Sequence, residues 1–187
     1  MSENFSATSA TQISSSEGVM SMRLLDRIAL RCEQIWNERG KTAACEYANQ
    51  NTNLESLREG LASGDELTRT KVVYLLSLLE PKEVAIELQH VLRFDECPIV
   101  RHEAAYFIGT MHFAGATEAL GRSLLEDSNE LVRHESAEAL GELGLQAGLP
   151  WLKKAANDPS PLVRRTIEIA ERHIALKTEF RERHKTD

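Results

Sequence analysis

The chain has 187 residues, of which 42% are hydrophobic, 27% charged and only 5% aromatic, and its formal net charge is −7. This composition is that of a globular protein, and the scarcity of aromatic, glycine and proline residues favours an all-α fold over a β-sandwich or barrel. The negative net charge argues against a nucleic-acid-binding protein, and no apolar run reaches the length of a membrane span.

The N-terminal third of the chain divides into a polar segment and two helices. Residues 1–22 are rich in serine and have almost no apolar periodicity, so we expect a flexible tail there. From Arg23 onwards, apolar residues recur every three or four positions, which predicts an amphipathic helix that ends at Gly40. A shorter helix is predicted around 42–49, and together these helices should form an N-terminal cap over residues 23–52.

The rest of the chain, 53–183, contains an internal repeat. A motif typified by "VRHE" places an arginine at steps of 32, 32 and 31 residues, at Arg69, Arg101, Arg133 and Arg164. A second helical stretch precedes each motif, at 53–62, 82–93, 115–125 and 147–156. A period of about 32 residues with two helices in each repeat predicts an α-solenoid of about four helix pairs.

An aspartate accompanies the arginine in three of the repeats. Asp95, Asp127 and Asp158 each precede their motif arginine by six residues. Near the start of a helix, an aspartate can cap the helix, interact favourably with its dipole, and pair with the arginine of the same or a neighbouring repeat. We therefore expect the arginines to be structural.

The His-Glu pairs that follow the arginine occur only in the two inner repeats. His102 aligns with His134 and Glu103 with Glu135, whereas the outer repeats have Thr-Lys and Arg-Thr at these positions. The repeat itself therefore does not require the pair. The non-functional alternative is that the two His-Glu pairs recur by chance on a solvent-exposed surface, because glutamate is favoured early in any helix.

A metal site is the functional interpretation of the two pairs. The second helices of a solenoid line one face with their axes about 8–10 Å apart, so His102 and His134 should lie side by side and could share one metal ion. Each glutamate lies about 100° further round its helix and need not bind the same ion as its own histidine. A second copy of the chain facing the first would supply the missing carboxylate, and a two-fold dimer would then hold ligands for two metals.

The repeats resemble the HEAT-like repeats of the phycobilisome-lyase class, and the motifs "RHEAAYFIG" and "RHESAEALG" resemble one half of the deoxyhypusine hydroxylases. That family has four His-Glu motifs in two facing halves around a di-iron centre, so the resemblance implies an iron-dependent monooxygenase. Carried over, His102 and His134 would bind one iron, Glu103 would bind the iron of the opposite half, and Glu135 would lie near the substrate amine or support the ligands. Independently of the resemblance, Tyr106 lies one turn after His102, a position that fits either a residue lining the substrate groove or a residue used in packing.

This chain has only one such half, so the resemblance requires a homodimer, with two irons in the dimer, or another partner half. The substrate would be a protein or another amine-bearing molecule, and zinc or manganese at the same ligands stays open. The alternative is a metal-free HEAT-repeat scaffold that binds protein segments, or an accessory protein like the phycobilin lyases.

Other chemistries find no support in the sequence. It has no glycine-rich phosphate loop, no GxSxG motif and no cysteine with a histidine placed beside it. Three cysteines without CxxC spacing, and an N-terminus unlike a signal peptide, favour the cytoplasm.

Overall fold

A computed structural model describes residues 11–62, 65–79 and 81–184, and the described residues form helices and no strands. The prediction of an all-α fold is therefore confirmed. The chain divides into an N-terminal body, up to Leu78, and a C-terminal body, from Leu79. Within the described residues, no helix combines the length and apolarity that crossing a membrane requires.

The N-terminal body contains helices α1 (Thr11–Arg39), α2 (Lys41–Asn51), α3 (Leu54–Leu61) and α4 (Glu66–Leu76). Helix α1 contacts the other three helices of this body. The helix pair α3 and α4 is the first repeat, with a capping box at Asn53 that starts α3 and the Asp65 side chain capping α4.

The start of α1 differs from the sequence prediction. We expected a flexible tail over 1–22, but the helix begins at Thr11, twelve residues before Arg23. Extending an existing helix needs no new nucleus, so a serine-rich segment can continue a helix that it could not start. Residues 1–10 lie outside the described part of the chain.

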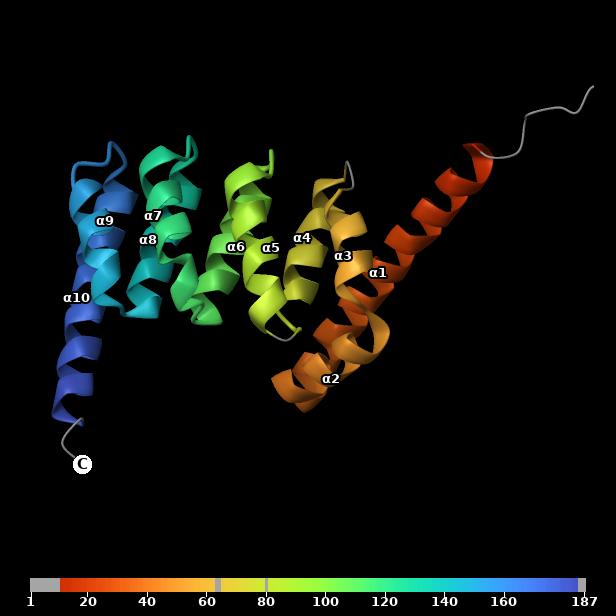
Figure 1. Ribbon diagram of the computed structural model, residues 1–187, viewed down its shortest axis with the longest axis horizontal. Coiled ribbons are helices and arrows are strands. Elements are labelled where there is room, and N and C mark those ends of the chain that lie inside the picture. The colour runs from red at the N-terminus through yellow and green to blue at the C-terminus, as the bar shows by residue number, and fades with distance from the viewer. Residues whose placement is uncertain (1–10, 63–64, 80, 185–187) are drawn as a thin grey trace, which may run out of the picture. The chain divides into compact units, whose positions relative to one another are not determined.

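The C-terminal body is a stack of helix pairs (Figure 1). Over its described residues the pairs are α5 (Pro81–Phe94) with α6 (Pro98–Thr110), α7 (Thr117–Glu126) with α8 (Glu130–Leu143), and α9 (Leu149–Lys154) with α10 (Pro161–Arg183). A short 3₁₀ turn precedes α7 at Ala114–Ala116 and another precedes α9 at Gln146–Gly148. The second helices pack on one another in the order α6, α8, α10, and they form the layer that the solenoid prediction requires.

Small residues set how closely the second helices approach. A Cβ added at Gly109 of α6 would lie 2.9 Å from the Cα of Ala139, and one added at Gly141 of α8 would lie 2.8 Å from the Cα of Ala170. Neither helix could come this close if its glycine carried a side chain. The buried apolar residues Val100, Val132 and Val163, at equivalent positions of the three helices, complete the packing at their N-terminal ends.

Candidate metal centre

An Arg–Asp ladder fixes the start of each second helix and so positions the histidines beyond it. Arg101 donates two hydrogen bonds to Asp127 of the next repeat, at 2.7 and 2.8 Å, and Arg133 repeats the arrangement with Asp158 at 2.7 and 3.0 Å. Each guanidinium also donates to the backbone carbonyl of its own repeat's aspartate, Asp95 or Asp127, at 2.8 and 3.0 Å. The arginines are therefore structural in the described structure.

The aspartates do not cap their helices through the side chain. The carboxylates of Asp95, Asp127 and Asp158 accept the backbone N–H two residues later, which closes a turn just before the helix begins. The sequence left open whether each aspartate pairs with the arginine of its own or of a neighbouring repeat. The carboxylates of Asp127 and Asp158 pair with the arginine of the preceding repeat.

His102, in the second turn of α6, lies between two carboxylates. Its Nε2 is 3.2 Å from an oxygen of Glu135 on α8, and its Nδ1 is 3.5 Å from an oxygen of Glu103. Hydrogen bonds to Glu103 and then to Glu135 raise the pKa of His102 to about 9, against the opposing effect of burial. Without a metal, the imidazole is therefore a cation held between two acidic groups.

His134, at the equivalent position of α8, has different partners. Its Nδ1 is 2.6 Å from the hydroxyl of Thr166 on α10, and its Nε2 is 3.6 Å from a carboxylate oxygen of Glu138, one turn further along α8. His134, Glu135 and Glu138 each offer a ligand atom, and these three atoms lie within 4.8 Å of one another. Glu135 is 7% exposed. Through its contact with the half-buried His102, it also links this cluster to the neighbouring helix.

The structure brings together most of the residues singled out from the sequence, but in other pairings. The expectation that the two histidines share one ion directly stays a prediction, because they meet through Glu135. Glu103 turns back toward its own histidine, although its position on the helix suggested that it would point elsewhere. Tyr106 is largely exposed with its ring against Phe107, and its place in a substrate groove stays a prediction.

Glu138 was not identified from the sequence. The signal was present, because residues four apart on a helix share a face, and "HESAE" places a carboxylate four positions after His134. The first motif has Tyr106 at the equivalent position, which conceals the pattern when the two motifs are compared.

The chemistry of this cluster fits a divalent metal. Imidazole nitrogens and carboxylate oxygens are the ligands that iron, zinc and manganese take in proteins, with bonds of about 2 Å. Donor atoms within 4.8 Å of one another can reach one such ion by small side-chain rotations. A divalent ion would place two positive charges beside the buried carboxylate of Glu135, where His102 supplies one.

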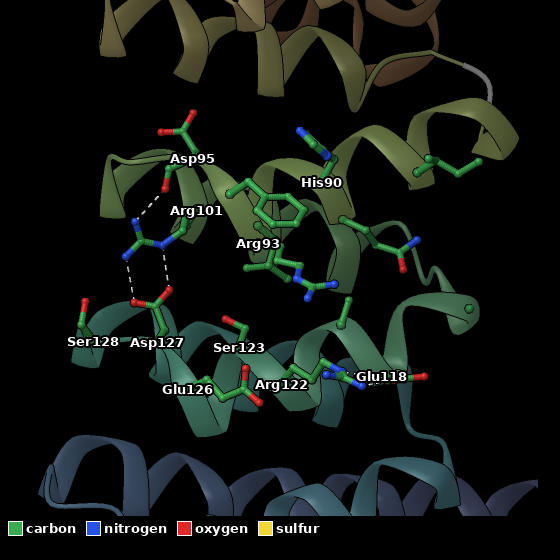
Figure 2. A pocket seen from close by; sticks show the side chains of 16 residues that line it. His90, Arg93, Asp95, Arg101, Glu118, Arg122, Ser123, Glu126, Asp127 and Ser128 are labelled. Atoms are coloured by element: carbon green, nitrogen blue, oxygen red, sulfur yellow. Dashed lines mark hydrogen bonds and ion pairs between the residues drawn. The ribbon is translucent and has the colours of Figure 1, made fainter.

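A separate pocket of about 810 Å³ lies between α5 and α7, and it is not lined by any of the His-Glu residues (Figure 2). Its charged groups include Arg101 and Asp127, which pair with each other, and Arg122, which pairs with Glu118 on the same helix. These two ion pairs are satisfied within the fold, whereas three ligand atoms converge in the His-Glu cluster, which is therefore the better candidate for chemistry.

Comparisons with known proteins agree with the repeat fold. A family model described as HEAT repeats matches residues 87–170. A deoxyhypusine hydroxylase of Oryza sativa is 32% identical over 125 residues, which are 66% of this chain and 41% of that protein. The deoxyhypusine hydroxylase of Saccharomyces cerevisiae is 32% identical over 136 residues, which are 72% of this chain and 38% of that protein.

Among solved structures, human deoxyhypusine hydroxylase in complex with glycerol matches with a TM-score of 0.60 and 23% identity, over 86% of this chain and 65% of that one. This match supports the fold. The chain spans about two fifths of the length of the rice and yeast relatives. It is therefore an all-α solenoid protein with HEAT repeats, similar in sequence to part of the deoxyhypusine hydroxylases.

Proposed function

We propose that this chain is one half of a non-haem di-iron monooxygenase related to deoxyhypusine hydroxylase, and that two copies face each other to complete the site. The observation that carries the proposal is the cluster in which His134, Glu135 and Glu138 converge while Glu135 also contacts His102. The similarity to deoxyhypusine hydroxylases supports iron as the metal and an amine-bearing side chain of a protein as the substrate.

In this proposal, the residues of the His-Glu motifs bind the metal and orient the substrate. His102 and His134 hold the metal, and Glu138 adds a carboxylate from the same helix as His134. Glu103 binds the metal of the facing copy. Glu135, buried and negative, completes the ligands or orients the cationic amine of the substrate. Bound iron would supply the capacity to activate dioxygen, which no protein side chain has.

The first test measures metal and mass together on the full chain. Protein purified without chelators and exposed to ferrous iron should contain about one iron per chain and run as a dimer in light scattering. A metal-free monomer that takes up no ferrous iron in the presence of oxygen would exclude the proposal and favour the scaffold alternative.

A pair of variants then locates the metal. His134→Ala should remove most of the iron while leaving the helical circular dichroism and the unfolding midpoint nearly unchanged, because the ring is partly exposed. His173→Ala, an exposed histidine on α10, is the matched control and should keep the wild-type iron content. Loss of the fold in His134→Ala would mean that this histidine serves packing instead.

A further inference from the structure

Thr166 occupies an unusual position beside the candidate metal centre. It is a buried polar residue on α10, in the last repeat, which lacks the His-Glu pair, and it takes the place that Glu135 takes in the preceding repeat. Its hydroxyl makes two contacts, one at 3.1 Å to the backbone carbonyl of Leu162 and one at 2.6 Å to Nδ1 of His134.

The Thr166 hydroxyl has one hydrogen for these two contacts. The contact that receives this hydrogen decides whether Nδ1 of His134 accepts or donates. A hydroxyl has a single hydrogen and two lone pairs, so it can donate once and accept at the same time. The Thr166 hydroxyl donates to the Leu162 carbonyl, as Thr178 does to Ile174 about three turns further along α10. With the hydroxyl hydrogen on that carbonyl, the oxygen accepts from His134, and this assignment puts a hydrogen on Nδ1.

We infer that Thr166 is a positioning residue, which keeps the hydrogen of the His134 ring on Nδ1 and so directs the lone pair of Nε2 at the metal. This inference rests on the proposed function, in which His134 is a ligand. Nε2 lies on the side of Glu138, 3.6 Å from its carboxylate. Glu138 and Glu135 are the two residues that form the ligand cluster with His134. A metal-binding histidine commonly donates its other ring N–H to a fixed acceptor, which selects the tautomer and the ring orientation.

The ring nitrogens of His102, in the neighbouring repeat, have different partners from those of His134. His102 has a carboxylate at each ring nitrogen, from Glu103 and Glu135, and neither contact distinguishes one nitrogen from the other. His134 has the Glu138 carboxylate near Nε2 and a neutral hydroxyl at Nδ1. The two histidines of the motif therefore differ in how strictly their orientation is fixed, and His134 is the pre-oriented one.

The test uses the metal-free full chain and nitrogen NMR of its histidine rings. His134 signals are assigned by their loss in His134→Gln, and spectra are recorded above the titration midpoint of that ring. The wild type should show the Nδ1–H tautomer. Thr166→Val has the same shape without the hydroxyl and should shift His134 toward the Nε2–H tautomer, whereas Thr166→Ser should restore the wild-type pattern. Thr178→Val is the matched control and should leave His134 unchanged.

Metal affinity gives the second readout, measured by titration with zinc and with anaerobic ferrous iron. Thr166→Val should bind about 10- to 100-fold more weakly than wild type, with Thr166→Ser close to wild type. A wild-type ring in the Nε2–H form, or a valine variant with unchanged tautomer or unchanged affinity, would overturn the inference. A wild-type chain with the expected tautomer that binds neither metal would instead disprove the proposed function, so the two failures are distinguishable.

Discussion

Arg133 and Asp158 lie 25 residues apart in sequence and are joined by two hydrogen bonds of 2.7 and 3.0 Å, with both side chains almost fully buried. The same bond pair joins Arg101 to Asp127 one repeat earlier. Each pair ties the start of one second helix to the loop that begins the next one. The ladder therefore transmits the position of one repeat to its neighbour, and the candidate ligands follow directly after its arginines.

Removing one partner of this ladder should destabilise the protein strongly. Arg133→Met leaves the buried Asp158 carboxylate without its guanidinium, and we expect a loss of about 3 kcal/mol in the free energy of unfolding, measured with urea. Arg165→Met is the control, because Arg165 pairs with Glu168 in an exposed ion pair and should change the stability by less than about 0.5 kcal/mol. Equal effects of the two substitutions would show that the ladder contributes no more than a surface ion pair.

The ladder also predicts an acid-dependent loss of stability. Burial alone would raise the pKa of Asp158, but hydrogen bonds from Arg133 and from the Ser160 N–H, with the charges of Arg133 and Arg164, hold it below the ordinary 3.8. A lowered pKa means that the folded state binds fewer protons than the unfolded state, so this stabilisation is present above pH 3.8 and is lost as the pH falls through the folded-state value.

Urea midpoints measured at a series of acidic pH values test this sign. The wild type should lose stability more steeply than Asp158→Asn, which has no proton to gain at this position. Parallel curves for the two proteins would contradict the assignment.

Glu138 should contribute to metal binding although it is more than half exposed. Glu138→Gln removes one carboxylate charge from the cluster with His134 and Glu135, so zinc and ferrous iron should bind at least about 10-fold more weakly. Glu142→Gln, one turn further along α8, is the matched control because its carboxylate faces Lys177 and lies outside the cluster. The role of Glu138 as a ligand would be excluded by equal affinities of the two variants.

The close approach of the second helices should leave no room for a methyl group at the glycine between them. Gly109→Ala places a Cβ 2.9 Å from the backbone of Ala139, and we expect the strain of about 1–3 kcal/mol to exceed the gain of about 1 kcal/mol in helix propensity. Gly115→Ala, where nothing lies within 4 Å of the added atom, should show no such loss. Thermal unfolding of both variants checks the difference.

The sequence predicted the repeats because apolar spacing, the motif arginines and the helix-start residues all have the same period of about 32. It also placed His102 and His134 at equivalent positions of adjacent helices. It could not give the pairings, because these depend on how each helix is rotated and on side-chain rotamers. Glu103 turns back along α6, and Thr166 reaches His134 from a repeat that has no His-Glu motif at all.

The glycines Gly109 and Gly141 lie toward the opposite ends of their helices from the histidines, yet they set the distances at which the candidate ligands meet. Gly109 governs the approach of α6 to α8, across which His102 reaches Glu135, and Gly141 governs the approach of α8 to α10, across which His134 reaches Thr166. The distances between the candidate ligands can therefore be changed independently at Gly109 and at Gly141, and neither residue is itself a ligand. Graded substitutions there would shift the spacing between donor atoms, and with it the ionic radius that the site accepts, without replacing any ligand residue.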